Sequence, residues 1–372
     1  MSRRIYLDYN ASAPVRPSVR EAMLETLALV GNPSSLHAEG RAARRRREQA
    51  REAVAALIAA RPSEITFTSG GTEANALALQ GCGRARLLVS AGEHVSVLEA
   101  RGDAELLPLA DDGQLDCLAL RERLAAAEEG ALVSVQLANN ETGVIQPLAQ
   151  VVEIAREAGA LVHCDAIQAA GKLPLDVAAL DVDFLTLSAH KLGGPQGVGA
   201  LWVRSGLDIQ PLQRGGGQEL RRRGGTENLP GIVGFGSAAE AAAGELGQMP
   251  SLARWRDTME QRILAAEPQV QIPGSRAPRL PNTSCLLSPL LPAEVLLMAL
   301  DLDGFAISSG SACSSGKVGV SHVLKAMGVK DELLEQAIRV SLGWASAPGD
   351  AEAFAEAWIE LHRRRRAKSE VA

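Results

Sequence analysis

The sequence has few aromatic residues, no CxxC pair of cysteines and no long apolar run. Aromatic residues make up 3% of the 372 residues, so Ala, Leu and Val must supply most of the core packing. The five cysteines are an odd number without CxxC spacing, which argues against a disulfide framework or a zinc ribbon. No stretch is apolar for long enough to cross a membrane, and the N-terminus lacks the apolar core of a signal peptide. We expect a cytoplasmic protein with reduced thiols, no bound metal and no membrane attachment.

Basic residues are not in excess, and very few of them are lysines. The formal net charge is −6, and six of the 38 basic residues are lysines. A nucleic-acid-binding protein usually has a basic balance or a basic face. The run from Arg44 to Arg47 could bind phosphates. However, Glu48 and Glu52 follow it, with apolar residues at helical spacing, so we interpret it as the solvated face of a helix. We expect no direct binding of nucleic acid.

Short apolar runs alternate with longer helical patterns. Residues 131–137, 160–165 and 183–188 predict buried strands, and residues 146–159 predict a helix between the first two. Strands and helices in this order are typical of a parallel sheet with crossover helices. The sequence therefore predicts the α/β class.

The pattern changes after about residue 245. Helical stretches at residues 251–266 and 351–366 surround short strand-like pieces. We expect a large domain over residues 15–247 and a smaller α/β domain over residues 248–372, completed by residues 1–14.

A glycine turn joins a strand-like run to a helical run within EITFTSGGTEANALALQG. Free backbone N–H groups at a helix start attract an anion such as phosphate, and glycines such as Gly71 allow close approach. Thr72 adds a hydroxyl donor. From these residues alone, Thr72 as an ordinary N-cap with Glu73 behind it is an equally good interpretation.

Two charged residues follow neighbouring predicted strands. Asp165 comes just past the end of ALVHCD's apolar run, and Lys191 follows the next strand between Ser188, His190 and a glycine-rich stretch. Ligands of open parallel sheets bind at the carboxyl ends of the strands. A desolvated lysine becomes nucleophilic, and a carboxylate can keep a ring nitrogen protonated, which together suit pyridoxal 5′-phosphate (PLP). Taken singly, Asp165 could cap a helix and Lys191 could be a surface lysine.

Three further residues are candidates for chemistry. His94 could stack on a planar ring or move a proton, although a lone histidine is more often structural. Cys313 lies among small residues in SSGSACSSG, which predicts a reachable thiol, whereas Cys164 and Cys285 have the apolar neighbours of buried cysteines. Arg339 could bind a substrate carboxylate through two hydrogen bonds or form an ordinary salt bridge.

Together these residues resemble the NifS/IscS-type cysteine desulfurases of the class V aminotransferase family. Four blocks carry the likeness: FTSGGTEAN, HCDAIQ, SAHKLGGPQGVGAL and SSGSACSSG. It runs from YLDYNASAP to AIRVSLG, nearly the whole chain. The resemblance implies PLP fold type I, with a mostly parallel seven-stranded sheet flanked by helices. It also implies a homodimer with active sites at the subunit interface, PLP as cofactor and L-cysteine as substrate.

The resemblance also assigns roles to single residues. Lys191 is the Schiff-base lysine, Asp165 the partner of the pyridine nitrogen, and His94 the ring-stacking residue and candidate acid–base group. Cys313 is the nucleophile that becomes a persulfide and leaves L-alanine, and Arg339 binds the substrate carboxylate. The other cofactor-binding positions are Gly71, Thr72, Ser188 and His190 at the phosphate, Asn140 (also near substrate) and Gln168 near the phenolic oxygen, and Thr226 at the phosphate of the other subunit.

The sequence departs from these relatives at residues 10–13, where NASA replaces an ATT-like pattern, and at Gly319-Val320, where Glu-Pro is frequent. The chain also ends soon after a predicted helix that stops near Arg366. A sulfur-acceptor protein, such as an iron–sulfur scaffold or a tRNA-thiolation protein, is the expected partner. The alternatives are an aminotransferase or selenocysteine lyase of the same family, and a non-catalytic protein that keeps the fold.

Overall fold

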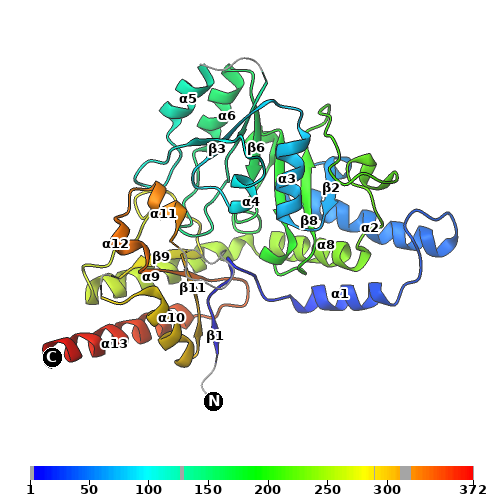
Figure 1. Ribbon diagram of the computed structural model, residues 1–372. Coiled ribbons are helices and arrows are strands. Elements are labelled where there is room, and N and C mark those ends of the chain that lie inside the picture. The colour runs from blue at the N-terminus through cyan, green and yellow to red at the C-terminus, as the bar shows by residue number, and fades with distance from the viewer. Residues whose placement is uncertain (1–3, 126–129, 289, 311–319, 372) are drawn as a thin grey trace.

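The computed structural model describes residues 4–125, 130–288, 290–310 and 320–371. A seven-stranded sheet has the order β2–β8–β7–β6–β5–β3–β4. Its strands β2, β8, β6 and β3 are labelled in Figure 1. Neighbouring strands are parallel except at β8, which runs antiparallel to both β7 and β2. This confirms the predicted mostly parallel seven-stranded sheet. The strands are β2 (Ile65–Thr68), β3 (Arg86–Ser90), β4 (Glu105–Leu107), β5 (Ala131–Ser134), β6 (Leu161–Asp165), β7 (Phe184–Ser188) and β8 (Gly199–Val203).

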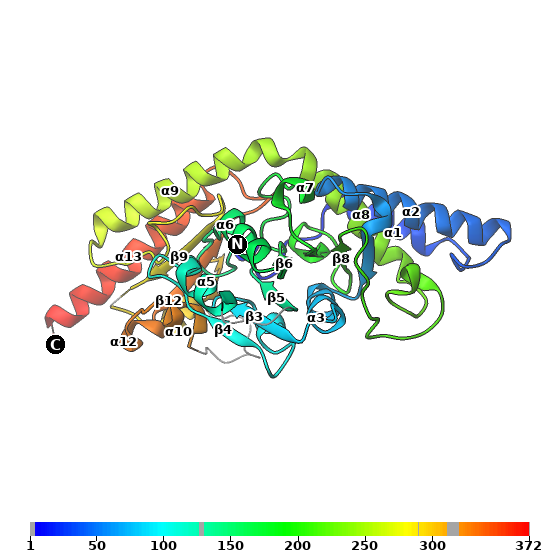
Figure 2. The ribbon, with the colours of Figure 1, turned by 90° about the horizontal axis from the view of Figure 1, so that it is seen from above.

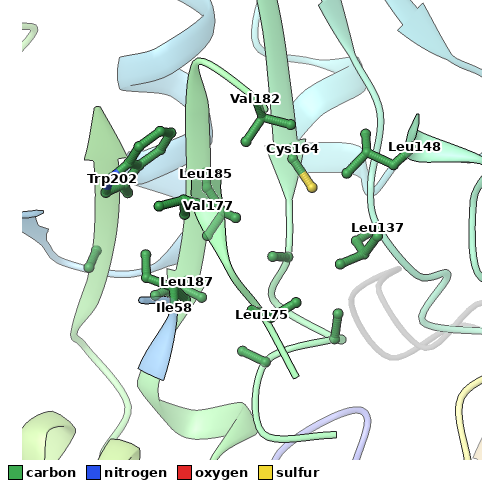
Figure 3. Packing of buried hydrophobic residues seen from close by; sticks show 14 of the residues in the cluster. Ile58, Leu137, Leu148, Cys164, Leu175, Val177, Val182, Leu185, Leu187 and Trp202 are labelled. Atoms are coloured by element: carbon green, nitrogen blue, oxygen red, sulfur yellow. The ribbon is translucent and has the colours of Figure 1, made fainter. Parts of the chain in front are cut away.

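Side chains of the strands alternate between two apolar cores. Val89 of β3 packs in a cluster with α3, whereas its neighbour Leu88 belongs to a larger cluster on the other face, with α2, α6 and α8. In that larger cluster Cys164, Leu185 and Trp202 are paired across neighbouring strands (Figure 3). Apolar clusters therefore cover both faces of the sheet. The ends of the strands remain as the place where a site can form. The helices of this part are α1 (Pro17–Leu27), α2 (Ala38–Leu57), α3 (Gly71–Gly81), α4 (Val95–Leu98), α5 (Cys117–Ala125), α6 (Leu148–Glu157), α7 (Val177–Leu180) and α8 (Leu229–Gly244).

A smaller antiparallel sheet, β11–β12–β9, lies in the C-terminal part with helices packed on it. Its apolar side chains form a separate cluster, to which Leu7 from the N-terminal segment contributes. Figure 2 shows α9 and α13 side by side. These separate cores support our proposed division into residues 15–247 and 248–372, completed by 1–14. The elements are β1 (Ile5–Tyr6), α9 (Met249–Ala266), β9 (Thr283–Leu287), α10 (Ala293–Leu302), β10 (Phe305–Ala306), β11 (Ser308–Ser309), α11 (His322–Ala326), α12 (Asp331–Leu334), β12 (Ala337–Ser341) and α13 (Asp350–Val371).

Some element ends differ from the sequence-based expectation. Helix α13 continues past Arg366 to Val371, and Glu360 pairs with Arg363 and Arg364 one turn further on, which favours continued helix. Strand β5 ends at Ser134 and not at residue 137, whereas β6 ends at Asp165 as predicted. Within the described part of the chain, no helix combines the length and apolarity needed to span a membrane.

Candidate active site

A cavity of about 330 Å³ lies where β6 and β7 end. Both strands are parallel, so the residues at their ends reach the same edge of the sheet. The cavity volume is in the range of small-molecule and cofactor sites. It brings together ten residues that the sequence analysis selected: Gly71, Thr72, His94, Asn140, Asp165, Gln168, Ser188, His190, Lys191 and Arg339.

Asp165 is a buried carboxylate held by two donors. Asn75 Nδ2 and the Ile167 backbone N–H each donate to it at 2.9 Å. Burial raises its pKa, while these hydrogen bonds and the nearby His94 and Lys191 act in the opposite direction. Burial and the charge of Asp165 raise the pKa of the neighbouring Glu93 well above its usual value. Glu93, whose pKa is raised well above its usual value, is therefore the more easily protonated member of the pair, and Asp165, which accepts two hydrogen bonds, is the candidate partner of a protonated ring nitrogen.

Lys191 lies on a short 3₁₀ turn, Ala189–Lys191, that follows β7 directly. Its Nζ donates to the carbonyl oxygens of Asn10 at 2.5 Å and Ala11 at 2.7 Å. Gly193 two residues later has φ +82°, and a Cβ there would lie 2.8 Å from the Arg16 side chain. The glycine after the lysine is therefore required by both backbone conformation and packing.

His94 is the N-cap of α4. Its Nδ1 accepts from the Ser96 backbone N–H at 3.1 Å, which leaves Nε2 to carry the ring proton. Burial lowers the pKa of His94, and Lys191 and His322 lower it further, against the raising effect of Asp165. The ring is therefore neutral at neutral pH and can stack or accept a proton.

The start of α3 faces the same cavity. Its N-cap is Gly70, without any side-chain cap, so the alternative of Thr72 as an ordinary N-cap is wrong. A Cβ on Gly71 would lie 2.3 Å from Ile167 Cδ1, so a larger residue would have to displace the end of the Ile167 side chain. Burial, then Lys191, lowers the pKa of His190 to about 4, so this ring is neutral and can donate one hydrogen bond. Uncapped helix N–H groups with nearby neutral donors suit a phosphate.

Arg339 lies on β12 and is almost fully buried, with 2% of its side chain exposed. It donates to Asp8 Oδ1 at 2.8 Å and to the Asn140 carbonyl oxygen at 3.2 Å. Its Nε is buried and has no hydrogen-bond partner among the described residues. The salt bridge that the sequence left open is thus present, and the Arg339 side chain also lines the cavity.

Among the predicted residues that the structure describes, Thr226 does not line this cavity. Thr226 is exposed and lines a separate cavity with Ser69 and Arg223. Cys313 lies outside the described residues. The sequence analysis also missed partners that complete the site, namely Asn75 and Asn10. Asn75 is one helical turn beyond Thr72 in the same block, a spacing that could have identified it.

His163 lies on β6 two residues before Asp165 and is completely buried between Ser134 Oγ at 2.8 Å and Thr186 Oγ1 at 3.0 Å. Burial lowers its pKa to about 3. The unfolded histidine binds a proton below about pH 6.5, so this residue destabilises the fold progressively as pH falls from 6.5 towards 3.

We expect His163→Asn to lose less free energy of unfolding than the wild type between pH 7 and pH 5, by about 2 kcal/mol. Urea unfolding at both pH values measures this, with His37→Gln at an exposed position as the control. An equal loss in wild type and His163→Asn would contradict the assignment.

The fold is that of an α/β enzyme, and the cavity lies at the carboxyl ends of its parallel strands, where such folds bind their ligands. The chain belongs to the class V aminotransferase family, whose model matches residues 5–354. It is similar to a cysteine desulfurase of Cereibacter sphaeroides, with 45% identity over 92% of each chain. An IscS-like cysteine desulfurase of Mycobacterium tuberculosis is 40% identical over 94% of each chain.

Solved structures agree with this assignment. A NifS-like protein from Rickettsia africae has a TM-score of 0.90 and 35% identity, covering 97% of this chain and 100% of its own. A structure described as SspA in complex with cysteine has a TM-score of 0.77 and 32% identity, covering 91% and 98%. The predicted family and fold type are therefore confirmed.

Proposed function

We propose that this protein is a PLP-dependent cysteine desulfurase that transfers the sulfur of L-cysteine to Cys313 and releases L-alanine. The observation that carries the proposal is the meeting of Lys191, Asp165 and Arg339 in one cavity. Relatives described as cysteine desulfurases cover more than nine-tenths of the chain. An aminotransferase has no need for Cys313, which favours the desulfurase over that alternative.

The residues fit the cofactor. Asp165 is the carboxylate that would hold a ring N–H⁺, and the uncapped α3 with Gly71 would hold a phosphate. His94 would stack on the ring, Ser188, His190 and Thr72 would add donors at the phosphate, and Lys191 would hold the group covalently. When bound, PLP supplies an electron sink that stabilises negative charge at the substrate Cα.

The side chains of this chain would then bind the substrate and move its protons. Arg339 would orient the cysteine carboxylate together with Asn140, since both residues line the cavity. His94 is a neutral base at neutral pH. In the net step the Cβ–S bond of cysteine breaks, an S–S bond forms to Cys313, and Cβ gains the proton that the Cys313 thiol loses. Thiol plus cysteine thus gives persulfide plus alanine, with no external oxidant.

The direct test is to supply the PLP-loaded protein with L-cysteine. We expect L-alanine, with an equal amount of sulfide once a thiol reductant removes the persulfide. Formation of a keto acid without sulfide would identify an aminotransferase. Turnover of L-selenocysteine but not of L-cysteine would identify a selenocysteine lyase, and protein that stays colourless with PLP would be non-catalytic.

We further propose a homodimer in which Thr226 serves the partner's site. Thr226 is exposed and does not line the candidate active-site cavity of the same chain. Its segment is anchored by the buried pair of Arg51 and Glu219, which share two hydrogen bonds of 2.7 Å. Apolar side chains that a second copy could cover are exposed in the N-terminal part: Val15, Leu24, Leu27, Val30 and Leu36.

A sulfur-acceptor protein, such as an iron–sulfur scaffold or a tRNA-thiolation protein, would then collect the sulfur from Cys313. Persulfide chemistry needs reduced thiols. The four described cysteines are free, which suits a reducing compartment such as the cytoplasm.

A further inference from the structure

A second lysine, Lys172, lies next to the proposed active site and lines a small cavity together with Lys191. It belongs to the turn that follows β6 and is one helical turn beyond Gln168. Its Nζ donates to the Gln168 carbonyl oxygen at 2.8 Å and to Gln168 Oε1 at 3.2 Å. Gly171 fixes the turn, because its φ is +70° and a Cβ there would lie 2.8 Å from Leu192.

Lys172 has no carboxylate at ion-pair distance among the described residues. The charged groups that act on it are Lys191 and Arg339, and burial followed by these two cations lowers its pKa to about 7. Lys172, Lys191 and Arg16 line one small cavity of about 40 Å³, in which Arg16 is already paired with Glu245. Burying a lysine beside two other cations costs folding free energy. Charge pairing does not offset this cost, so the contact of Lys172 with Gln168 needs another explanation.

Gln168 links Lys172 to Lys191 through a shared acceptor. Its Nε2 donates to the Asn10 carbonyl oxygen at 3.0 Å, and Lys191 Nζ donates to the same oxygen at 2.5 Å. With the amide reversed, Oε1 would face the Asn10 oxygen and the NH₂ group would face the Lys172 donor. Both contacts would then be unfavourable. The Asn10 oxygen and the protonated Lys172 amine therefore favour the same one of the two amide orientations.

We propose that Lys172 is a positioning residue that holds the Gln168 side chain with its NH₂ group on the Lys191 side of the cavity. This inference rests on the proposed function, in which Gln168 lies near the phenolic oxygen of PLP. An N–H donor at that oxygen stabilises its anion. The anion then holds the proton on the Lys191 nitrogen less strongly, which lowers the pKa of the nitrogen through which Lys191 would bind PLP.

The test is a pH titration of the visible absorption of PLP-loaded protein. We expect Lys172→Met to raise the titration midpoint by about 1 unit, and Lys172→Arg, which keeps a donor, to raise it less. The same lysine-to-methionine change at the exposed Lys330 is the matched control and should leave the midpoint unchanged. We also expect kcat to fall about ten-fold in Lys172→Met.

A double-mutant cycle separates positioning from a direct effect of charge. If Lys172 acts through Gln168, then Lys172→Met adds little to the shift already present in Gln168→Met. An equal shift in both backgrounds, or a wild-type midpoint in Lys172→Met, would overturn the inference. Should Lys172→Met not fold, as judged by circular dichroism, Gln168→Met decides, because a wild-type midpoint there overturns it as well. Wild-type protein without visible absorption would instead sink the proposed function.

Discussion

Replacing Lys191 with alanine should abolish the visible absorption of PLP-loaded protein and reduce alanine formation from cysteine by about 10³-fold or more. Lys191 is the lysine that the strand order places at the mouth of the sheet, opposite Asp165 in the same cavity. Without its amine, PLP can be held only by hydrogen bonds and by the charge of Asp165. Borohydride reduction followed by mass spectrometry should find the adduct on Lys191 in the wild type.

Lys325→Ala, at an exposed position on α11, is the control for this variant and should keep both colour and activity. A coloured Lys191→Ala protein with a reducible adduct on another lysine would overturn the assignment. Lys172, near enough to act electrostatically on Lys191, would be the first residue to examine in that case.

The second large effect is expected at Cys313. Cys313→Ala should still bind PLP with unchanged colour, but sulfide release from L-cysteine should fall by at least about 10²-fold, because no thiolate remains to attack the substrate sulfur. The two variants therefore separate the chemistry of the cofactor from the chemistry of sulfur. Alanine and sulfide should be measured together, with and without a thiol reductant.

Cys82→Ala is the matched control, since Cys82 is a partly exposed thiol whose pKa burial raises, making it a poor nucleophile. It should behave as the wild type. Sulfide release retained in Cys313→Ala would sink the desulfurase proposal while leaving a PLP enzyme in place.

Local patterns in the sequence predicted the half of the site that the parallel sheet supplies. Asp165 and Lys191 follow neighbouring strands, and parallel strands bring their carboxyl ends to one edge, so their meeting could be expected. The glycine turn before α3 was recognised from its glycines and from the helix start that follows them. Local patterns could not decide whether Thr72 is the N-cap of the helix. In the structure the N-cap is Gly70.

The other half of the site comes from contacts between distant segments. Asn10 forms hydrogen bonds with Asn140, Gln168 and Lys191. Asp8 accepts a hydrogen bond from Arg339. No periodic pattern in the sequence around these two residues predicts partners so far along the chain. Thr226 presents the same difficulty, because its proposed partner is in another subunit. The family resemblance assigns a role to a residue only where a shared motif is present. At residues 10–13 this sequence differs from the family's pattern, so no role was assigned to Asn10.

The N-terminal segment also bears on the order in which the protein can assemble during synthesis. Asn10 donates to Thr283 and accepts from Asn282, and β1 is parallel to β10. The backbone oxygens that hold Lys191 therefore acquire their final positions only after residues near 305 and 341 have left the ribosome. Domains generally fold from the N-terminus as they emerge. Here β1 can pair only after β10 has been synthesised. A ribosome-bound chain can therefore complete the central sheet, β2 to β8, well before it can complete the proposed catalytic centre.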